Sequence, residues 1–192
     1  AFYDAWARRV LAGEGYGPAP YYMAPLYPYL LAALYAVAGH SLAAVAWIQS
    51  ALGLVNLWMV YWLGRRLDGH ATGLLAMLLA MLYGPLMFLE VKPLTETVAI
   101  ALALASLTAL SGALRRPGVA RFAGVGALLG LSCLARPNML MATAAIGAFL
   151  GVRWLLRRPG PRFAHLAAMG VALLATIAPV TVRNAVVGGD RA

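Results

Sequence analysis

Residues 71–114 read ATGLLAMLLAMLYGPLMFLEVKPLTETVAIALALASLTALSGAL, two long apolar runs on either side of a short charged segment. Ala71–Leu89 contains no charged residue, and neither does Thr97–Leu114. Between them lies EVKPLTE (90–96), with two carboxylates, a proline and the only lysine of the chain. A membrane-spanning helix needs about 17–25 mostly apolar residues. The stretch therefore predicts two spanning helices joined by a charged turn.

The composition of the whole chain is that of a membrane protein. Hydrophobic residues make up 63% of the 192 residues and charged residues 11%, whereas soluble domains are about half apolar and about a quarter charged. The net charge of +9 is better explained by arginines that fix the orientation of a membrane protein than by nucleic-acid binding. No nucleic-acid partner is therefore expected. The first residues, AFYDAWARRVLAGEG (1–15), have the pattern of an amphipathic helix that has begun before residue 1. We therefore interpret the chain as a fragment of a longer protein.

Six apolar runs separated by turn signals predict an all-α, polytopic membrane bundle. The predicted spans are Leu42–Leu63, Ala71–Leu89, Thr97–Leu114, Phe122–Ala135, Met139–Leu156 and His165–Val182. The spans define a transmembrane bundle over residues 42–184. Residues 1–41 are predicted to form a first outer loop, and residues 185–192 the truncated start of a further outer segment.

The connections between the predicted spans fall into two alternating sets, and the two sets differ in their numbers of cations and acids. One set of connections holds nine arginines and one acid: Arg65, Arg66, Arg115, Arg116, Arg121, Arg153, Arg157, Arg158 and Arg162, with Asp68. The other set holds six cations and five acids: Arg8, Arg9, Lys92, Arg136, Arg183 and Arg191, with Asp4, Glu14, Glu90, Glu96 and Asp190. Because basic connections stay in the cytoplasm, the mixed set is predicted to lie outside, and the chemistry with it.

Residues 17–40 contain four prolines and six of the tyrosines lie within or beside them, but the apolar run Leu30–Ala38 is too short to span. Tyrosine favours the membrane boundary, so Pro28–Gly39 is predicted to be a helix lying in the outer interface. If this segment spanned instead, the whole orientation would invert, and the arginine distribution argues against that.

Two features inside the spans point to helix packing. Phe122–Ala135 reaches only about 21 Å at 1.5 Å per residue, and Gly124, Gly126 and Gly130 allow it to approach its neighbours closely. Gln49, Gly53 and Asn56 share one helix face. We interpret that face as a site of hydrogen bonding between helices in preference to ligand contact.

The turn EVKPLTE has two interpretations. Pro93 suits the first turn of the next helix, where the helix dipole favours the Glu96 carboxylate by a few tenths of a kcal/mol; the turn is then only capped and solvated. Alternatively, Glu90, Lys92 and Glu96 form an outer site. The carboxylates are then candidates to bind a divalent ion or to take a proton from an acceptor, and Lys92 is a candidate to pair with phosphate.

Other polar residues at predicted helix ends have both structural and functional interpretations. Arg136, in LARPN (134–138), has the geometry to hold phosphate through two hydrogen bonds, or it extends along the membrane boundary. The same alternatives apply to Arg183 and Asn184. The histidines His40, His70 and His165 stand singly and form no metal-ligand spacing.

Four segments resemble, in order, the membrane half of GT-C glycosyltransferases, in the branch of the protein O-mannosyltransferases and aminoarabinose transferases. They are FYDAWARRVLAGEGYG (2–17), YYMAPLYPYLLAALYAVAGHSLAAVAWIQSALG (21–53), LEVKPLTETVAIALALASL (89–107), and GLSCLARPNML (130–140) followed by APVTVRN (178–184). The resemblance implies a GT-C bundle that moves a sugar from a polyprenyl-phosphate donor to an acceptor on the outer face.

Only some of the family's site residues have a counterpart in this sequence. The catalytic aspartate of the family's first loop lies about four residues before the tyrosine that aligns with Tyr3, a position before Ala1; Asp4 is a second catalytic candidate. The lysine position of the aminoarabinose transferases is Ala24 here, which points to a broader subgroup of sugar transferases. The resemblance places Glu96 at the acid that begins the family's fourth span, and makes Lys92, Arg136 and Tyr22 candidates for binding the donor phosphate.

The leading hypothesis is therefore an inverting glycosyltransferase of the bacterial cytoplasmic membrane with its active site outside. Its expected partners are a polyprenyl-phosphate sugar, a lipid, glycan or protein acceptor, and the bilayer. Its candidate cofactor is a divalent metal ion bound by Glu90 and Glu96. The alternative is a polytopic protein without enzymatic activity, such as a transporter segment, although terminal charges and the lack of an internal repeat favour the transferase.

Overall fold

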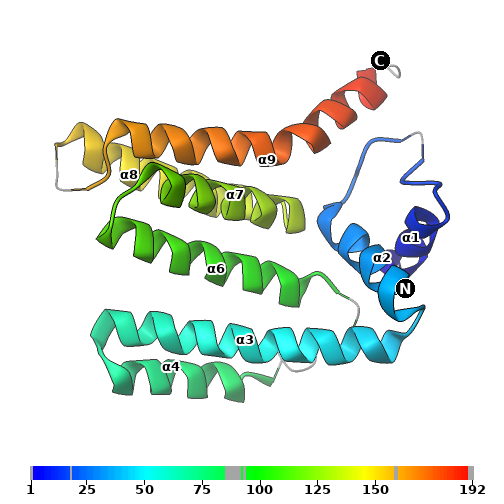
Figure 1. The fold of residues 1–192 in the computed structure, drawn as a ribbon, viewed down its shortest axis with the longest axis horizontal. Helices are drawn as coiled ribbons and strands as arrows, with labels where there is room; N and C mark the ends of the chain where they lie inside the picture. The colour runs from blue at the N-terminus through cyan, green and yellow to red at the C-terminus, as the bar shows by residue number, and fades with distance from the viewer. Residues whose placement is uncertain (1, 18, 85–91, 93, 158–159, 190–192) are drawn as a thin grey trace. The chain divides into compact units, whose positions relative to one another are not determined.

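The structure, a computed structural model, describes residues 2–17, 19–84, 92, 94–157 and 160–189. Within these residues it is all-α, as predicted, with no strand. The helices are α1 (Phe2–Leu11), α2 (Leu26–Ala38), α3 (Leu42–Asp68), α4 (His70–Leu82), α6 (Glu96–Arg115), α7 (Val119–Ala135), α8 (Met139–Leu155) and α9 (Phe163–Gly189) (Figure 1).

Each predicted span contains a helix, and α3, α6 and α9 are long and apolar enough to cross a membrane. Several boundaries differ from the prediction: α3 continues past Leu63 to Asp68, and α7 begins at Val119 in place of Phe122. In the run predicted over Ala71–Leu89, α4 ends at Leu82, where Tyr83 leaves the helical conformation with a ψ of 87°, and residues 85–89 lie outside the described residues. The last helix continues past Val182 to Gly189, since no helix-ending glycine occurs before Gly188.

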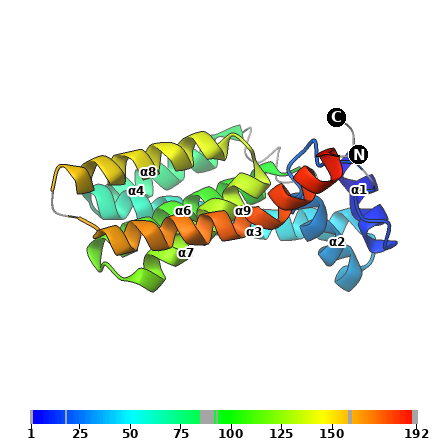
Figure 2. The same ribbon diagram turned by 90° about the horizontal axis from the view of Figure 1, so that it is seen from above.

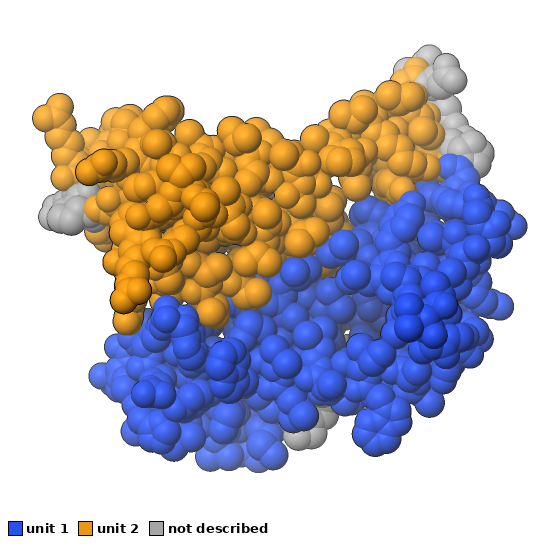
Figure 3. Space-filling view, viewed as in Figure 1, with its two compact units in different colours: residues 1–18, 25–104 blue, residues 19–24, 105–192 orange. Residues whose placement is uncertain are grey.

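The chain divides into two compact units, coloured in Figure 3. Unit 1 contains residues 1–18 and 25–104, and unit 2 contains residues 19–24 and 105–192.

In unit 1, α3 and α4 form an antiparallel hairpin that turns at Gly69, whose φ of 90° suits glycine. Glycine also allows the two helices to touch: a Cβ on Gly73 would lie 2.6 Å from the backbone oxygen of Tyr61. The amphipathic helix α1 packs on α2, and both cover the start of α3 around a core of buried residues. This core contains Ala7, Tyr27, Leu31, Ala32, Tyr35 and Val45. Val98 of α6 packs against the same core, so the start of α6 belongs to this layer.

In unit 2, α7 lies along α9 (Figures 1 and 2). Phe122 stacks on His165 with ring centroids 5.2 Å apart, and Gly126 and Gly130 face residues successively further along α9, so the two helices run parallel. A Cβ on Gly126 would lie 2.0 Å from the Met169 oxygen. The predicted close packing is confirmed at Gly126 and Gly130, whereas Gly124 faces open space.

The two ends of unit 2 differ in charge. The end of α6, the start of α7, the end of α8 and the start of α9 meet in one core that includes Ala113, Phe122, Leu150 and Met169. Six described arginines lie at this end: Arg115, Arg116, Arg121, Arg153, Arg157 and Arg162. Because α7 and α9 are parallel, Arg136 and Arg183 both lie toward the opposite end. Unit 2 thus has the alternation of connections that the sequence predicted.

Candidate functional site

Glu96 is the first residue of α6, and its side chain is partly inside the protein. Its neighbours Thr95 and Thr97 are buried, and its own Oε2 atom has almost no exposed surface. The helix N-terminus stabilises a carboxylate at this position. Glu96 is therefore not the fully solvated turn residue of the simpler interpretation.

Two amides of α3 hold the backbone on either side of Glu96. Gln49 donates from Nε2 to the Leu94 carbonyl oxygen at 3.0 Å, and Asn56 donates from Nδ2 to the Thr97 carbonyl oxygen at 3.2 Å. Both amide side chains are buried. The predicted role of this α3 face in hydrogen bonding to a neighbouring segment is confirmed, and the segment it binds is the one that carries Glu96.

Tyr27 of α2 lies near Gln49 and Glu96, and only 3% of its surface is exposed. Burial raises the pKa of Tyr27 above its ordinary value, and the nearby Tyr35 and Glu96 side chains add to the rise, whereas a hydrogen-bonding contact with the Gln49 side chain lowers it. The phenol is therefore a protonated hydroxyl at every physiological pH. Sequence reasoning missed Tyr27, because one tyrosine among many near the membrane boundary gives no local signal.

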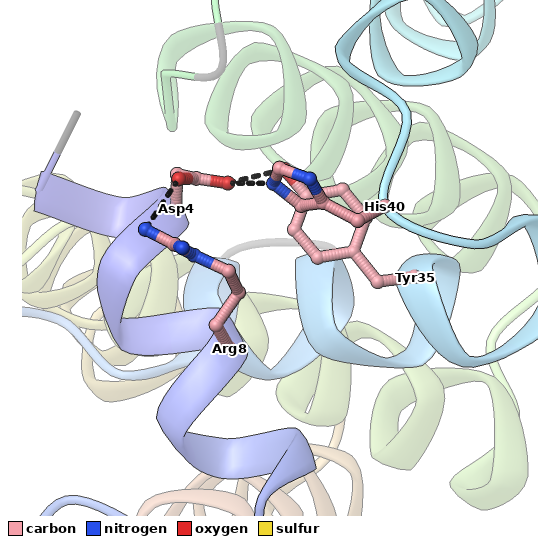
Figure 4. Close-up of polar contacts among 4 residues, drawn as sticks. All are labelled: Asp4, Arg8, Tyr35 and His40. Atoms are coloured by element: carbon pink, nitrogen blue, oxygen red, sulfur yellow. Dashed lines mark hydrogen bonds and ion pairs between the residues drawn. The ribbon is translucent and has the colours of Figure 1, made fainter.

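Asp4 lies in a second polar cluster of unit 1, drawn in Figure 4. Its Oδ1 atom accepts hydrogen bonds from the Tyr35 hydroxyl at 2.9 Å and from Nε2 of His40 at 2.8 Å. Its Oδ2 atom lies 3.3 Å from the Arg8 guanidinium. Neither Tyr35 nor His40 was predicted as a site residue, since each stands more than thirty positions from Asp4 in the sequence.

These contacts determine the charge of Asp4. Burial by itself would raise the pKa of the carboxyl, but the hydrogen bonds from His40 and Tyr35 outweigh it. The positive charge of Arg8 acts in the same direction, so the pKa of Asp4 lies below its ordinary value of 3.8. The same hydrogen bond, together with burial, raises the pKa of Tyr35 to about 12. A carboxylate in this state is a weak base.

The charged turn before α6 is described only in part. Lys92 is exposed, and its carbonyl oxygen accepts a 2.7 Å hydrogen bond from the Leu94 nitrogen. Glu90 and Pro93 lie outside the described residues. Among the residues that are described, no group of three or more His, Cys, Asp or Glu side chains is arranged to hold a metal ion. The metal site of Glu90 and Glu96 stays a prediction.

The other two candidates for donor-phosphate binding, Tyr22 and Arg136, belong to unit 2. Arg136 follows the last residue of α7 and is exposed, and Tyr22 is 70% exposed. The structure thus places Glu96, Lys92 and Asp4 in unit 1 and the other two candidates in unit 2.

Side chains at the end of α9 bind the segment that carries Tyr22. Asn184 accepts from the Tyr21 nitrogen at 2.8 Å and donates to the Tyr21 oxygen at 3.4 Å. Arg183 donates to the Ala19 oxygen at 3.3 Å, and its guanidinium lies 4.1 Å from the centre of the Tyr21 ring. Of the two interpretations of Arg183 and Asn184, these contacts support the structural one.

A family model described as dolichyl-phosphate-mannose-protein mannosyltransferase matches residues 22–182. The chain belongs to this mannosyltransferase family. The match includes Tyr22, Lys92, Glu96 and Arg136, whereas Asp4 precedes it. No curated protein and no solved structure matched the chain.

Membership of the mannosyltransferase family confirms the GT-C resemblance. Together with the all-helical fold and its apolar helices, it makes the chain a membrane glycosyltransferase of the mannosyltransferase-like class. This finding decides between the two functional hypotheses in favour of the transferase.

Proposed function

We propose that the protein transfers a sugar from a polyprenyl-phosphate donor to a hydroxyl group of an acceptor on the outer face of a bacterial cytoplasmic membrane. The observation that supports this most directly is the position of Glu96. Its carboxylate is partly buried at the start of a spanning helix, and hydrogen bonds from α3 hold the backbone on both sides of it. A group held in this way is suited to act on a substrate without reorganising first.

The proposed reaction is a displacement with inversion at the anomeric carbon of the sugar. The acceptor oxygen forms the new bond to this carbon while the bond from the carbon to the phosphate oxygen breaks. The electron pair of the broken bond leaves with the polyprenyl phosphate. The acceptor proton passes to a carboxylate acting as general base, and we assign this role to Glu96.

The departing phosphate gains negative charge, which cations stabilise. We assign this task to the candidates for donor-phosphate binding. Lys92 acts as an exposed point charge, Arg136 offers the forked donors that match a phosphate, and Tyr22 offers an exposed hydroxyl. Asp4, with a lowered pKa and three polar partners, is better suited to holding α1 against α2 than to taking a proton.

The oxygen donors around Glu96 are of the type that Mg²⁺, Mn²⁺ and Ca²⁺ prefer. Glu90 and Glu96 would hold such an ion, and its charge would help to neutralise the donor phosphate. Removing divalent ions with EDTA should then abolish transfer, and adding Mg²⁺ or Mn²⁺ should restore it. Full activity in EDTA would remove the metal from the proposal.

The proposed function is tested with the full-length natural protein, purified in detergent and supplied with labelled sugars. One set of reactions contains polyprenyl-phosphate hexoses and pentoses, and the other contains the same sugars as nucleotide diphosphate conjugates. Transfer should occur only from a lipid-phosphate donor. Equal or faster transfer from the nucleotide sugars would contradict the proposed donor class.

A further inference from the structure

Four buried polar atoms beside Glu96 have no hydrogen-bond partner among the described residues. They are the Tyr27 hydroxyl, Oε1 of Gln49, Oδ1 of Asn56 and Oγ1 of Thr97. All four residues are at least nine-tenths buried, and they come from α2, α3 and α6. An unsatisfied buried polar group costs about 1–3 kcal/mol, and native proteins contain few. Their concentration around one carboxylate therefore needs a functional reason.

The orientation of the two amides follows from their partners. The carbonyl oxygens of Leu94 and Thr97 can only accept, so each amide must turn its nitrogen toward them. The amide oxygens of Gln49 and Asn56 are thereby left for another partner. Because Tyr27 stays protonated, its hydroxyl can both donate and accept; the Gln49 side chain lies beside it, but no partner meets full hydrogen-bond geometry among the described residues.

Among the parts of the lipid-linked sugar donor, this set of atoms favours the one that carries hydrogen-bond donors. Carboxylate and amide oxygens are acceptors, so they attract groups that carry O–H donors. A phosphate offers acceptors and negative charge, and a prenyl chain offers no polar group, so neither fits. A sugar ring offers several hydroxyl donors at neighbouring positions.

We propose that Tyr27 and Gln49 bind hydroxyl groups of the sugar carried by the donor. The proposal rests on the proposed function and adds a sugar-binding site, next to Glu96, that is separate from the cations assigned to the phosphate. Gln49 has two tasks here: its nitrogen positions the segment before Glu96, and its oxygen accepts from the sugar. Asn56 stands about two helical turns after Gln49 on α3, and Thr97 directly follows Glu96 on α6.

The test compares two matched variants on one helix, Tyr27→Phe and Tyr35→Phe. Each variant loses only a hydroxyl from a buried ring. The Tyr27 hydroxyl has no partner among the described residues, so Tyr27→Phe should keep or raise the melting temperature and increase KM for the donor about tenfold, the effect of one or two hydrogen bonds. The Tyr35 hydroxyl bonds Asp4, so Tyr35→Phe should lower the melting temperature and leave KM for the donor unchanged.

A binding experiment then measures what the sugar alone contributes to the affinity for the donor. The wild-type full-length protein and Tyr27→Phe are titrated with a polyprenyl-phosphate hexose and with the same polyprenyl phosphate without sugar, and thermal shifts give the affinities. The wild type should bind the sugar-bearing lipid more tightly, and Tyr27→Phe should lose this preference. Gln49→Met should lose it as well, with a lower melting temperature because the bond to Leu94 is gone.

The outcomes separate the two proposals. If the wild type prefers the sugar-bearing lipid and Tyr27→Phe keeps that preference, the sugar-binding site is wrong while the proposed function stands. A lowered melting temperature of Tyr27→Phe would also overturn the site, because the hydroxyl would then have a structural partner. If the wild type shows neither the preference nor sugar transfer, the proposed function itself fails.

Discussion

The hydroxyl of Tyr35 donates a 2.9 Å hydrogen bond to Oδ1 of Asp4, and this contact joins α2 to α1. His40, just beyond α2, binds the same oxygen. Tyr27 lies on the same face of α2 two turns before Tyr35, next to Gln49 and Glu96. One face of α2 therefore links the helix that begins the chain to the helix that begins with Glu96.

Replacing Asp4 tests whether this cluster is structural. Asp4→Asn loses the ion pair with Arg8 and weakens the bonds from Tyr35 and His40. Arg8 and His40 are about half exposed, so solvent reduces their contributions, and we expect a loss of about 1–2 kcal/mol of stability. The rate of sugar transfer per folded molecule should stay within about threefold of the wild-type rate, because a tenfold change would need about 1.4 kcal/mol of activation free energy. A loss of about 10²-fold at an unchanged melting temperature would make Asp4 a catalytic residue.

The lowered pKa of Asp4 predicts how stability depends on pH. The folded protein holds the carboxyl ionised to a lower pH than the unfolded chain, whose pKa is near 3.8. The stabilisation is therefore fully present above about pH 5 and is lost as the pH falls through the folded pKa. The difference in melting temperature between wild type and Asp4→Asn should be constant from pH 7 to about pH 5 and should shrink below about pH 4. A difference that grows as the pH falls would contradict this sign.

Two glycines of α7 provide a matched pair for helix packing. In Gly126→Ala the new Cβ would meet the Met169 backbone at 2.0 Å, so α7 and α9 must separate, at a cost of about 1–3 kcal/mol or more. In Gly124→Ala the Cβ meets nothing within 4 Å, and the gain in helix propensity should stabilise by up to about 1 kcal/mol. Melting temperatures in detergent measure both. Similar melting temperatures for the two variants would mean that α7 and α9 do not pack this closely.

Orientation in the membrane is tested by labelling single cysteines in intact cells. Ala12→Cys, beyond α1, should react with an impermeant thiol reagent from outside. Ala71→Cys, beside the arginines at the end of α3, should react only after the membrane is opened. Both positions are exposed, and a variant without Cys133 serves as the background. The reverse pattern would place the candidate site in the cytoplasm.

Local patterns in the sequence were sufficient to predict the helices and several of their contacts. Uncharged runs predicted a helix in each of the six apolar segments, of which α3, α6 and α9 are long enough to span a membrane. The helical spacing of Gln49 and Asn56 predicted a hydrogen-bonding face, and the glycines of α7 predicted close packing. These properties depend on residues within a few turns of one another, and such residues share a face whatever the tertiary fold.

Contacts between distant segments were not predictable in the same way. The partners of Asp4 stand 31 and 36 positions away, and Asn184 binds Tyr21 across 163 positions. Nothing local to Tyr27 distinguishes it from the tyrosines that lie at the membrane boundary. Its importance comes from three helices meeting at the start of α6, which only the folded structure shows.

Replacing Glu96 shows whether this carboxylate takes part in sugar transfer. Glu96→Gln keeps the size of the side chain and removes the charge, and Glu14→Gln does the same at an exposed acid that pairs with Arg9. Transfer from a polyprenyl-phosphate sugar is measured with both full-length variants, with melting temperatures to establish folding. Glu96→Gln should lower the rate by roughly 10²-fold or more, whereas Glu14→Gln should match the wild type. Wild-type turnover by folded Glu96→Gln would exclude Glu96 from the reaction and would make the charged turn a structural feature alone.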